Sequence, residues 1–524
     1  MQNDDGVIRE LARSRFGFTE LRPGQLRAVA AAAAGRDVLA VLPTGGGKSA
    51  IYELAGLLRP GPTVVVSPLI ALQQDQVAHV HAAGLPAIVL NSHQSPREHA
   101  ASLTATRGET FVFLSPEQLG NQETREAVRR AKPDLFVVDE AHLISQWGHD
   151  FRPDYMRLSA LADLLDVPVR IALTATAAQP VRDEICRRLA LRDPEIVVGD
   201  FDRPNIELSA RGFRSIDEKH GELEATAGVL DGAGIVYAST HAGAQDAHDV
   251  LAAAGHRVVL YHAGLGARAR RDAMTAYVDG SVRIVAATVA FGMGIDKPDV
   301  RWVIHLDPPP SLDAYYQEIG RVGRDGKLAH ARLLYRSEDF GAAVHFVARG
   351  VTGAAVSRVA VSLAAGDTVR ATRQGTAALA RLTDLGAAAW DASGEIRWTG
   401  ALSVEAAVAA SEAETQRENE VERSRLDMMR RYAEHTRCRR SFLLSYFGQD
   451  YPGRCGNCDN DETATVESPT PEPFAIGERV SSERWGEGTV QRYDGDQLTV
   501  LFDDHGYRDL LVPLVVERQL LRRV

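Results

Sequence analysis

The sequence predicts an α/β fold in which two lobes, each built on a parallel β-sheet, precede smaller accessory modules. The chain has 524 residues, too many for one hydrophobic core. Short β-branched and apolar runs alternate with helical patterns over about residues 20–335, as expected for parallel strands covered on both faces. Nine such runs exceed the usual size of one sheet, and residues 201–205 interrupt the series. We therefore place one lobe at residues 1–205 and a second at 206–338.

The nine predicted strands lie at 37–42, 63–67, 110–114, 135–139, 170–174, 235–238, 258–261, 283–287 and 302–306. Each is a run of apolar residues too short for a helix and is followed by a turn or a helical pattern. The carboxyl ends of such strands are where open α/β sheets bind their ligands. The residues that follow these runs are therefore the first candidates for function.

Three further units and a linker are predicted after the second lobe. Residues 339–402 read as helices followed by a hairpin, which is the order of elements in a winged helix. Residues 403–461 form a long, charged, alanine-rich helical pattern that leads into three cysteines. Residues 462–473 contain three prolines in a polar run and indicate a linker. Residues 474–524 alternate apolar and polar residues around Gly and Asp turns, which predicts a small β barrel.

Composition excludes a membrane protein and favours a cytoplasmic one. Hydrophobic residues make up 45% of the chain and charged residues 25%, as is usual for soluble proteins. No apolar run approaches the roughly 20 residues of a membrane helix, and the acidic N-terminus does not resemble a signal peptide. The net charge of −11 does not exclude DNA as a partner, because phosphate binding depends on local arrays of cations and backbone N–H groups.

A glycine-rich segment predicts a phosphate-binding loop. Thr44, Gly45, Gly46, Gly47, Lys48 and Ser49 follow a predicted strand and open a predicted helix. Glycines allow backbone N–H groups to approach phosphates, and a helix N-terminus favours negative charge. Lys48 is expected to contact the β- and γ-phosphates of ATP, and Ser49 to hold Mg²⁺. The first glycine of the general pattern is replaced by Leu42, so the match is not complete.

Two adjacent carboxylates and two arginines complete a predicted site for phosphoryl transfer. Asp139 and Glu140 end a buried strand, where two acids are costly unless a metal or a water uses them. Asp139 is expected to bind Mg²⁺, and Glu140 to orient and deprotonate the attacking water. Arg321 and Arg324, from the second lobe, are candidate arginine fingers. Either arginine alone is open to a structural interpretation, as a partner for an acid between the lobes.

The motif set resembles that of RecQ-family helicases of superfamily 2. The resemblance rests on the Asp-Glu-Ala-His run at 139–142, the Leu-Thr-Ala-Thr-Ala run at 173–177 and the arginine-containing segment at 317–324. The more specific matches are residues 16–25, which resemble the RecQ adenine-reading motif, and 145–153, which resemble the RecQ aromatic-rich loop. The resemblance implies two RecA-like lobes and an ATP-driven motor on DNA. No segment resembles the helicase-and-RNase-D-like C-terminal domain, which suggests a divergent bacterial branch.

The resemblance also implies roles for individual residues. Phe18, Arg22 and Gln25 are expected to bind the adenine ring, and Asp296 is expected to face the nucleotide between the lobes. Stacking of DNA bases on aromatic residues is sequence-independent, which suits a translocating motor. DNA contacts are expected from the aromatic-rich loop and from two hydroxyls after predicted strands: Trp147, His149, Phe151, Arg152, Ser67 and Thr288. Trp147 and Phe151 are also open to interpretation as ordinary core aromatics.

The clustered cysteines resemble the RecQ zinc module, with one change. Cys438, Cys455 and Cys458 match three ligands, but Asp461 stands where the family has a fourth cysteine. Zinc accepts a carboxylate oxygen, so a Cys₃Asp site is chemically sound, with His435 as the other candidate for the fourth ligand. A degenerate module without metal is the remaining alternative. The predicted winged helix precedes the cysteines here, whereas in typical RecQ proteins it follows them.

These features together predict an ATP-dependent DNA helicase that moves 3′-to-5′ in DNA repair or recombination, with ATP, Mg²⁺ and Zn²⁺ as cofactors. The expected partners are single-stranded and forked duplex DNA, in the cytoplasm near the nucleoid. The barrel at 474–524 resembles the Tudor-like, SH3-like barrels that end some superfamily 1 repair helicases, and suggests a protein partner. The alternatives are a DNA-stimulated translocase or remodeller that unwinds poorly, and a scaffold with an inactive ATPase.

Overall fold

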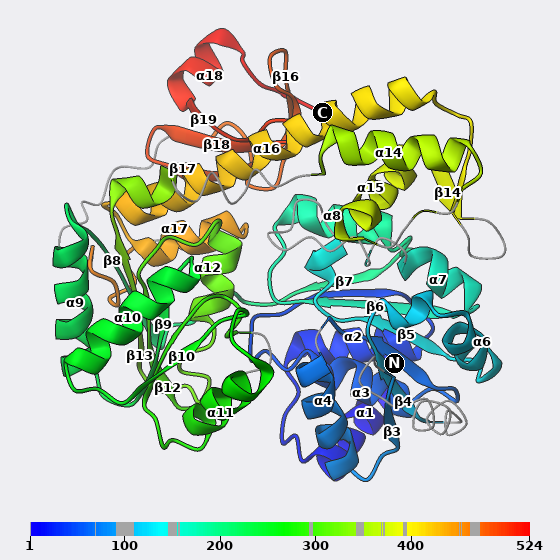
Figure 1. Cartoon of the computed structure of the whole chain (residues 1–524), viewed down its shortest axis with the longest axis horizontal. Helices are drawn as coiled ribbons and strands as arrows, with labels where there is room; N and C mark the ends of the chain where they lie inside the picture. Colours follow the sequence, from blue (N-terminus) through cyan, green and yellow to red (C-terminus); the bar gives the residue numbers. More distant parts are fainter. Residues whose placement is uncertain are drawn as a thin grey trace.

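The structure is a computed structural model of the chain. It describes residues 2–68, 70–90, 109–144, 155, 158–292, 297–341, 351–367, 369, 372–390, 396–449, 451, 453–461 and 472–524. Figure 1 shows two α/β lobes side by side, with the accessory elements lying across them. No helix in the described parts of the chain is long and apolar enough to cross a membrane.

The first lobe contains a seven-stranded parallel sheet in the order β3-β4-β2-β5-β6-β1-β7. Its strands β1, β2, β4, β5 and β6 are mostly apolar and are buried along their whole length. In chain order the strands are β1 Val38–Val41, β2 Thr63–Val66, β3 Ala87–Leu90, β4 Phe111–Leu114, β5 Leu135–Val138, β6 Val169–Thr174 and β7 Glu195–Val198. The helices are α1 Gln2–Phe16, α2 Pro23–Ala33, α3 Ser49–Leu57, α4 Ile70–Ala82, α6 Gln122–Arg130, α7 Leu158–Leu164 and α8 Gln179–Arg188, with 3₁₀ helices η1 Gln118–Gly120 and η2 Ala141–Ile144.

The second lobe contains a six-stranded parallel sheet in the order β10-β11-β9-β12-β13-β8. Its strands are β8 Ile206–Gly212, β9 Ala233–Tyr237, β10 Val258–Tyr261, β11 Ile284–Ala287, β12 Val300–His305 and β13 Ala329–Tyr335. The helices are α9 Ile216–Val229, α10 His241–Ala253, α11 Ala267–Val278 and α12 Leu312–Ile319. Ser215, Thr240 and Ser311 cap the N-termini of α9, α10 and α12 by accepting backbone N–H bonds. The prediction of two parallel-sheet lobes is confirmed.

The accessory region begins with two helices and a hairpin. These are α14 Gly353–Ala364, α15 Arg373–Asp384, β14 Ala388–Trp390 and β15 Ile396–Trp398. They share a small core around Val356, Leu363 and Leu382. The order matches the sequence prediction, and the assignment as a winged helix stays a prediction.

A long helix, α16 Val404–Glu434, and a short one, α17 Arg439–Tyr446, follow. The last unit consists of β16 Arg479–Ser482, β17 Gly486–Asp494, β18 Gln497–Phe502, β19 Gly506–Leu511, α18 Val512–Arg518 and β20 Arg522–Arg523. Its strands form an antiparallel sheet in the order β19-β18-β17-β16-β20. No pairing joins β19 to β20 among the described residues, so the predicted barrel is not confirmed and an open antiparallel sheet is found instead.

The C-terminal sheet is packed against α16 and α17, as Figure 1 shows in orange and red beside the yellow helix. The backbone N–H of Tyr507 donates to Ser424 Oγ at 3.0 Å, and the Tyr507 ring lies 5.5 Å from that of Tyr446. Gly506 approaches Ser424 so closely that a Cβ would overlap its hydroxyl. The C-terminal sheet is therefore packed into the accessory region and is not an independent module.

Candidate functional site

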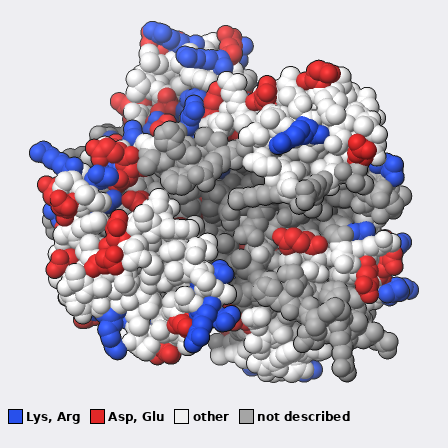
Figure 2. Space-filling view, in the orientation of Figure 1, with Lys and Arg blue, Asp and Glu red and all other residues white. Residues whose placement is uncertain are grey.

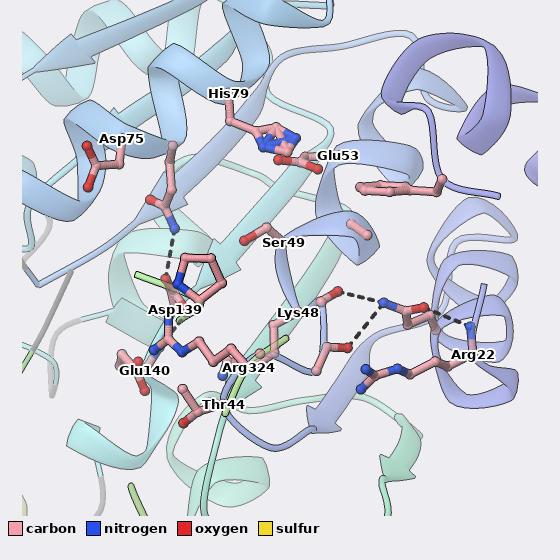
Figure 3. A pocket seen from close by; sticks show the side chains of 18 of the residues that line it. Arg22, Thr44, Lys48, Ser49, Glu53, Asp75, His79, Asp139, Glu140 and Arg324 are labelled. Carbon is pink, nitrogen blue, oxygen red and sulfur yellow. Dashed lines mark hydrogen bonds between the residues drawn. The ribbon is translucent and has the colours of Figure 1, made fainter. Parts of the chain in front are cut away.

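A pocket of about 630 Å³ lies between the two lobes, at the carboxyl ends of the central strands. Both lobes contribute to it, and Figure 3 shows Lys48, Asp139, Glu140 and Arg324 around the same space. The lobes also touch beside the pocket, because a Cβ added at Gly320 would lie 3.2 Å from Thr44 Cβ. The pocket brings together most of the predicted nucleotide residues: Phe18, Arg22, Gln25, Thr44, Gly45, Gly46, Gly47, Lys48, Ser49, Asp139, Glu140, Arg321 and Arg324.

The phosphate loop needs its glycines for conformation and for space. Gly45 and Gly47 have φ values of 74° and 73°, in the left-handed region that side-chain-bearing residues rarely adopt. A Cβ on Gly46 would lie 2.6 Å from Pro43 O. The loop leads from β1 into α3, which begins at Ser49. The backbone therefore has the strand-to-helix form that binds phosphate.

Gln25 is hydrogen-bonded to this loop. Its Nε2 donates to the carbonyls of Gly46 at 3.2 Å and Gly47 at 2.9 Å, and its Oε1 accepts from the N–H of Arg22 at 2.8 Å. Figure 3 shows these bonds as dashed lines. The predicted adenine-reading side chain thus connects the segment before α2 to the phosphate loop. Sequence reasoning placed it in the site but did not predict this link.

The Asp139–Glu140 pair is held by contacts that sequence reasoning missed. Gln76 Nε2, on α4, donates to Asp139 Oδ2 at 3.1 Å. Burial raises the pKa of Asp139, while Lys48 and the Gln76 bond lower it. Glu140 has a φ of 50°, a left-handed conformation that is uncommon for a side-chain-bearing residue and is frequent at functional sites. The backbone therefore supports a site at Glu140.

His142 connects this pair to the next strand. Its Nδ1 lies 3.4 Å from Glu140 Oε2 and 3.0 Å from Thr174 Oγ1 at the end of β6. Thr174 Oγ1 donates in turn to the carbonyl of Thr176. The Asp-Glu-Ala-His and Leu-Thr-Ala-Thr-Ala runs are thus joined by side-chain bonds. The sequence analysis gave no role to His142 or Thr174 and did not predict this link.

The two arginines of the second lobe differ in their surroundings. Arg321 is buried, and its Nη1 donates to the carbonyl of Gly292, in the segment that follows β11. Arg324 extends beside the phosphate loop. A Cβ added to Gly45 would lie 3.8 Å from the Cγ of Arg324. In Figure 3 its side chain points toward Asp139 and Glu140. Arg324 therefore faces the nucleotide pocket more directly than Arg321 does.

Several predicted DNA residues lie outside the described residues, namely Trp147, His149, Phe151 and Arg152, and so does Asp296. Tyr155, which follows the aromatic-rich loop, is buried and donates to the carbonyl of Asp139 at 3.4 Å. Tyr155 is thus attached to the residue that precedes Glu140. Sequence reasoning did not single out Tyr155.

The two hydroxyls expected at DNA phosphates are both buried. Ser67 is 0% exposed and Thr288 is 7% exposed, because each ends a central strand covered on both faces. Gln73 Nε2 donates to the Ser67 carbonyl, and the Thr288 N–H donates to the Tyr261 carbonyl. The expectation that these side chains contact DNA stays a prediction. On the face shown in Figure 2, basic and acidic side chains of the described residues are interspersed, without a continuous basic band.

Cys438, Cys455, Cys458 and Asp461 form one cluster. Their four ligand atoms lie within 4.8 Å of one another, a spacing that suits a tetrahedral metal. Hydrogen bonds from the Cys455 and Cys458 thiols lower the pKa of the Cys438 thiol, so the cluster favours a thiolate, the form that binds zinc. Asp461 Oδ1 is buried without a hydrogen-bond partner in the described structure. The donor set therefore fits Zn²⁺.

His435 lies outside that cluster. Its ring packs 4.8 Å from the Phe442 ring, and its Nδ1 lies 3.7 Å from Asp494 Oδ2. Asp461 Oδ2, in contrast, accepts from the Cys458 N–H at 2.8 Å. Of the two candidates for the fourth ligand, the geometry favours Asp461.

Comparisons with known proteins match this arrangement. The DEAD/DEAH box helicase family model matches residues 22–184, the helicase conserved C-terminal domain matches 224–326, and the RecQ zinc-binding family matches 402–462. The chain is 38% identical over 327 residues to a protein named probable ATP-dependent DNA helicase RecS of Bacillus subtilis. It is 32% identical over 454 residues to the ATP-dependent DNA helicase RecQ of Haemophilus influenzae. The chain belongs to the RecQ helicase family.

The matches have limited extent. They cover 62% of this chain and 66% of RecS, and 85% of this chain and 62% of the Haemophilus RecQ. The chain thus spans somewhat less than two thirds of these relatives. Among solved structures, the DUF1998 helicase MrfA bound to DNA matches 77% of this chain and 63% of its own at a TM-score of 0.55 and 16% identity. The Mycobacterium smegmatis helicase Lhr bound to ssDNA and AMP-PNP matches 79% of this chain and 61% of its own, at a TM-score of 0.53 and 18% identity. These two likenesses concern the fold.

Proposed function

We propose that this RecQ-family protein is an ATP-dependent DNA helicase that moves 3′-to-5′ on single-stranded DNA and separates duplex strands. The observation that carries the proposal is the pocket that joins Lys48, Asp139 and Glu140 of one lobe to Arg324 of the other. Such a site is complete only while the lobes are together, so hydrolysis and lobe movement are coupled by its construction. The sequence similarity to proteins named ATP-dependent DNA helicases supports DNA as the track.

Each side chain has a distinct part in hydrolysis. Lys48 and the loop N–H groups bind the ATP phosphates, and Glu140 orients the attacking water and accepts its proton. Arg324 stabilises the charge that develops on the γ-phosphate, and Arg321 holds the segment after β11 against the site through Gly292. Ser49 and Asp139 would hold Mg²⁺, which neutralises phosphate charge when bound. Gln25, Arg22 and Phe18 would bind the adenine.

DNA contact is expected from the aromatic-rich loop rather than from a basic surface. The mixed charges in Figure 2 support this view, because the described residues on that face form no continuous basic band. Tyr155, two residues after this loop in the sequence, contacts the Asp139 carbonyl, which supports a short path from a base stacked on Trp147 or Phe151 to Glu140. Three further points remain predictions. Residues 339–402 are expected to act as a winged helix at the fork, and residues 474–524 to bind a protein partner. The protein is expected to lie near the nucleoid and to act in repair or recombination.

Strand displacement on tailed duplexes tests the proposal. The full chain is expected to unwind a duplex with a 3′ single-stranded tail and not one with a 5′ tail, and only with hydrolysable ATP. Lys48→Ala and Arg324→Ala should abolish unwinding, while Trp147→Ala should retain basal hydrolysis and lose its stimulation by DNA. DNA-stimulated hydrolysis without strand separation would instead establish a translocase or remodeller.

A further inference from the structure

Glu53 is a buried carboxyl in the nucleotide pocket to which the site described above gives no role. It lies on α3, one turn after Ser49, and its side chain is among those that line the pocket. The residue is only 1% exposed, and its Oε2 has no hydrogen-bond partner in the described structure. Burying a carboxyl without a partner is costly unless it is neutral or a ligand supplies the missing bond.

Glu53 is neutral under ordinary conditions, because burial raises its pKa to about 8. The titratable and charged groups that line the pocket with it are Glu20, Arg22, Lys48, Asp75, His79, Asp139, Glu140, Arg321 and Arg324. None of these forms an ion pair with Glu53 in the described structure, so no cation holds it ionised. A neutral carboxyl carries one O–H donor and a carbonyl acceptor. An ionised carboxylate only accepts.

The position of Glu53 suits the base of the nucleotide and not its phosphates. The phosphates bind at the N-terminus of α3, and four residues along a helix move a side chain about 6 Å away from that end. Phe18 and His79 line the same pocket, and their rings form an aromatic group with Phe16 at centroid distances of 5.6–6.5 Å. Figure 3 draws Glu53 and His79 at the same end of the pocket, away from Asp139 and Glu140. Flat aromatic walls accommodate a purine ring.

We propose that Glu53 hydrogen-bonds the base of the bound nucleotide and, together with Gln25, selects adenine over guanine. The inference rests on the proposed ATPase and adds a specificity-determining residue to it. Both N–H donors of the Gln25 amide are bonded to Gly46 and Gly47, but its Oε1 keeps a second acceptor position, which matches the N6 amino group of adenine. The neutral Glu53 carboxyl then supplies a donor for the acceptor nitrogen N1. Guanine presents N–H donors at N1 and N2 instead, which an ionised carboxylate would accept.

The two protonation states of Glu53 therefore favour different bases. The neutral form serves adenine, and the ionised form loses the donor and gains affinity for guanine. The preference for ATP over GTP should fall as the pH rises through about 8. Glu53→Gln keeps a donor and an acceptor at every pH, so its preference should not change with pH. A matched control is Glu123→Gln, which replaces an exposed glutamate on α6 of the same lobe.

Equilibrium binding of ATP and of GTP to the full chain, measured by calorimetry at pH 7 and pH 9, tests the inference without requiring hydrolysis. The ATP preference of the unchanged chain and of Glu123→Gln is expected to fall about tenfold between the two pH values. Glu53→Gln should keep the same preference at both. A preference that does not change with pH in the unchanged chain, or that changes equally in Glu53→Gln, overturns the proposal. Selective, pH-dependent binding without any hydrolysis would support the role of Glu53 while refuting the proposed motor.

Discussion

The hydroxyl of Tyr432, on the long accessory helix α16, donates a 3.3 Å hydrogen bond to the hydroxyl of Tyr315 on α12, the helix that precedes Arg321 and Arg324. The Tyr315 ring packs 5.1 Å from that of His305, and His305 Nε2 lies 2.7 Å from Glu318 Oε2. All of these side chains are buried. The accessory region therefore contacts the arginine-bearing segment through a continuous packed path.

Loss of the Tyr432 hydroxyl should affect catalysis more than nucleotide binding. Tyr432→Phe removes one buried hydrogen bond, usually about 1 kcal/mol, and loosens the position of α12. We expect kcat of the DNA-stimulated ATPase to fall several-fold with little change in KM for ATP. Tyr493→Phe is a matched control, since it removes hydrogen bonds to Phe474 inside the C-terminal sheet. Equal losses in kcat for both variants would exclude a specific path through Tyr432.

Substitutions at Asp461 and at His435 test which of the two residues is the fourth zinc ligand. Asp461→Ala should lower the zinc content of the purified chain and its Tm, because one of four donors is removed. His435→Ala should leave zinc near one per chain. Asp461→Cys should retain the metal and resist chelators better than the natural residue does. Full zinc retention in Asp461→Ala, measured by atomic emission, would contradict the assignment.

Arg440 should be important for stability because it bonds the zinc module to the connection between the lobes. Its guanidinium is buried, lies 2.6 Å from Asp202 Oδ1 and donates to the carbonyls of Arg203 and Ile206 at 2.7 and 2.6 Å. Arg440→Ala leaves Asp202 and two carbonyls without these bonds, at a cost of about 3–5 kcal/mol. Chemical denaturation followed by far-UV circular dichroism measures the loss. Arg454→Ala, at an exposed arginine of the same module, should have a much smaller effect.

Glu53 should also make stability depend on pH. Its pKa is raised from 4.5 to about 8 in the folded chain, so the folded state holds a proton that the unfolded state releases between those values. Below about pH 4.5 the ionisation of Glu53 does not affect the free energy of unfolding. This free energy then falls as the pH rises, and above pH 8 it is lower by up to about 5 kcal/mol than below pH 4.5. Glu53→Gln should raise Tm at pH 9 and leave it unchanged at pH 4.5. An equal shift at both pH values would indicate a packing effect instead.

Most central strands could be predicted from the sequence, and most outer ones could not. All nine predicted runs are strands: eight are central and covered on both faces, and the ninth, β10, is a half-buried edge strand that is still continuously apolar. The missed strands β3, β7 and β8 lie at sheet edges, where half-exposed residues interrupt that pattern. The missed strand β13 alternates buried and half-buried residues beside β8. The apolar pattern thus finds strands whose side chains are continuously apolar, including β10, and misses strands interrupted by polar residues.

The same limit applies to the site. Residues in a local pattern, such as Lys48, Asp139 and Arg324, could be found because their chemistry depends on near neighbours in the chain. Gln76, His142 and Tyr155 could not, because each acts on a residue from a different element. The burial of Ser67 could not be predicted for a related reason. Its place after a strand was correct, but the covering layer above it is set by α4, which the local pattern does not reveal.

The segment around Cys458 also forms backbone hydrogen bonds with the edge strand β8. The Leu208 N–H donates to the Asn457 carbonyl at 3.2 Å, and the Asp459 N–H donates to the Leu208 carbonyl at 3.1 Å. β8 is the last strand of its sheet, and an uncovered strand of this kind invites pairing with other chains. A metal that fixes the cysteine segment would thereby shield the lobe from self-association. Chains stripped of zinc should aggregate through β8 before their nucleotide pocket is lost.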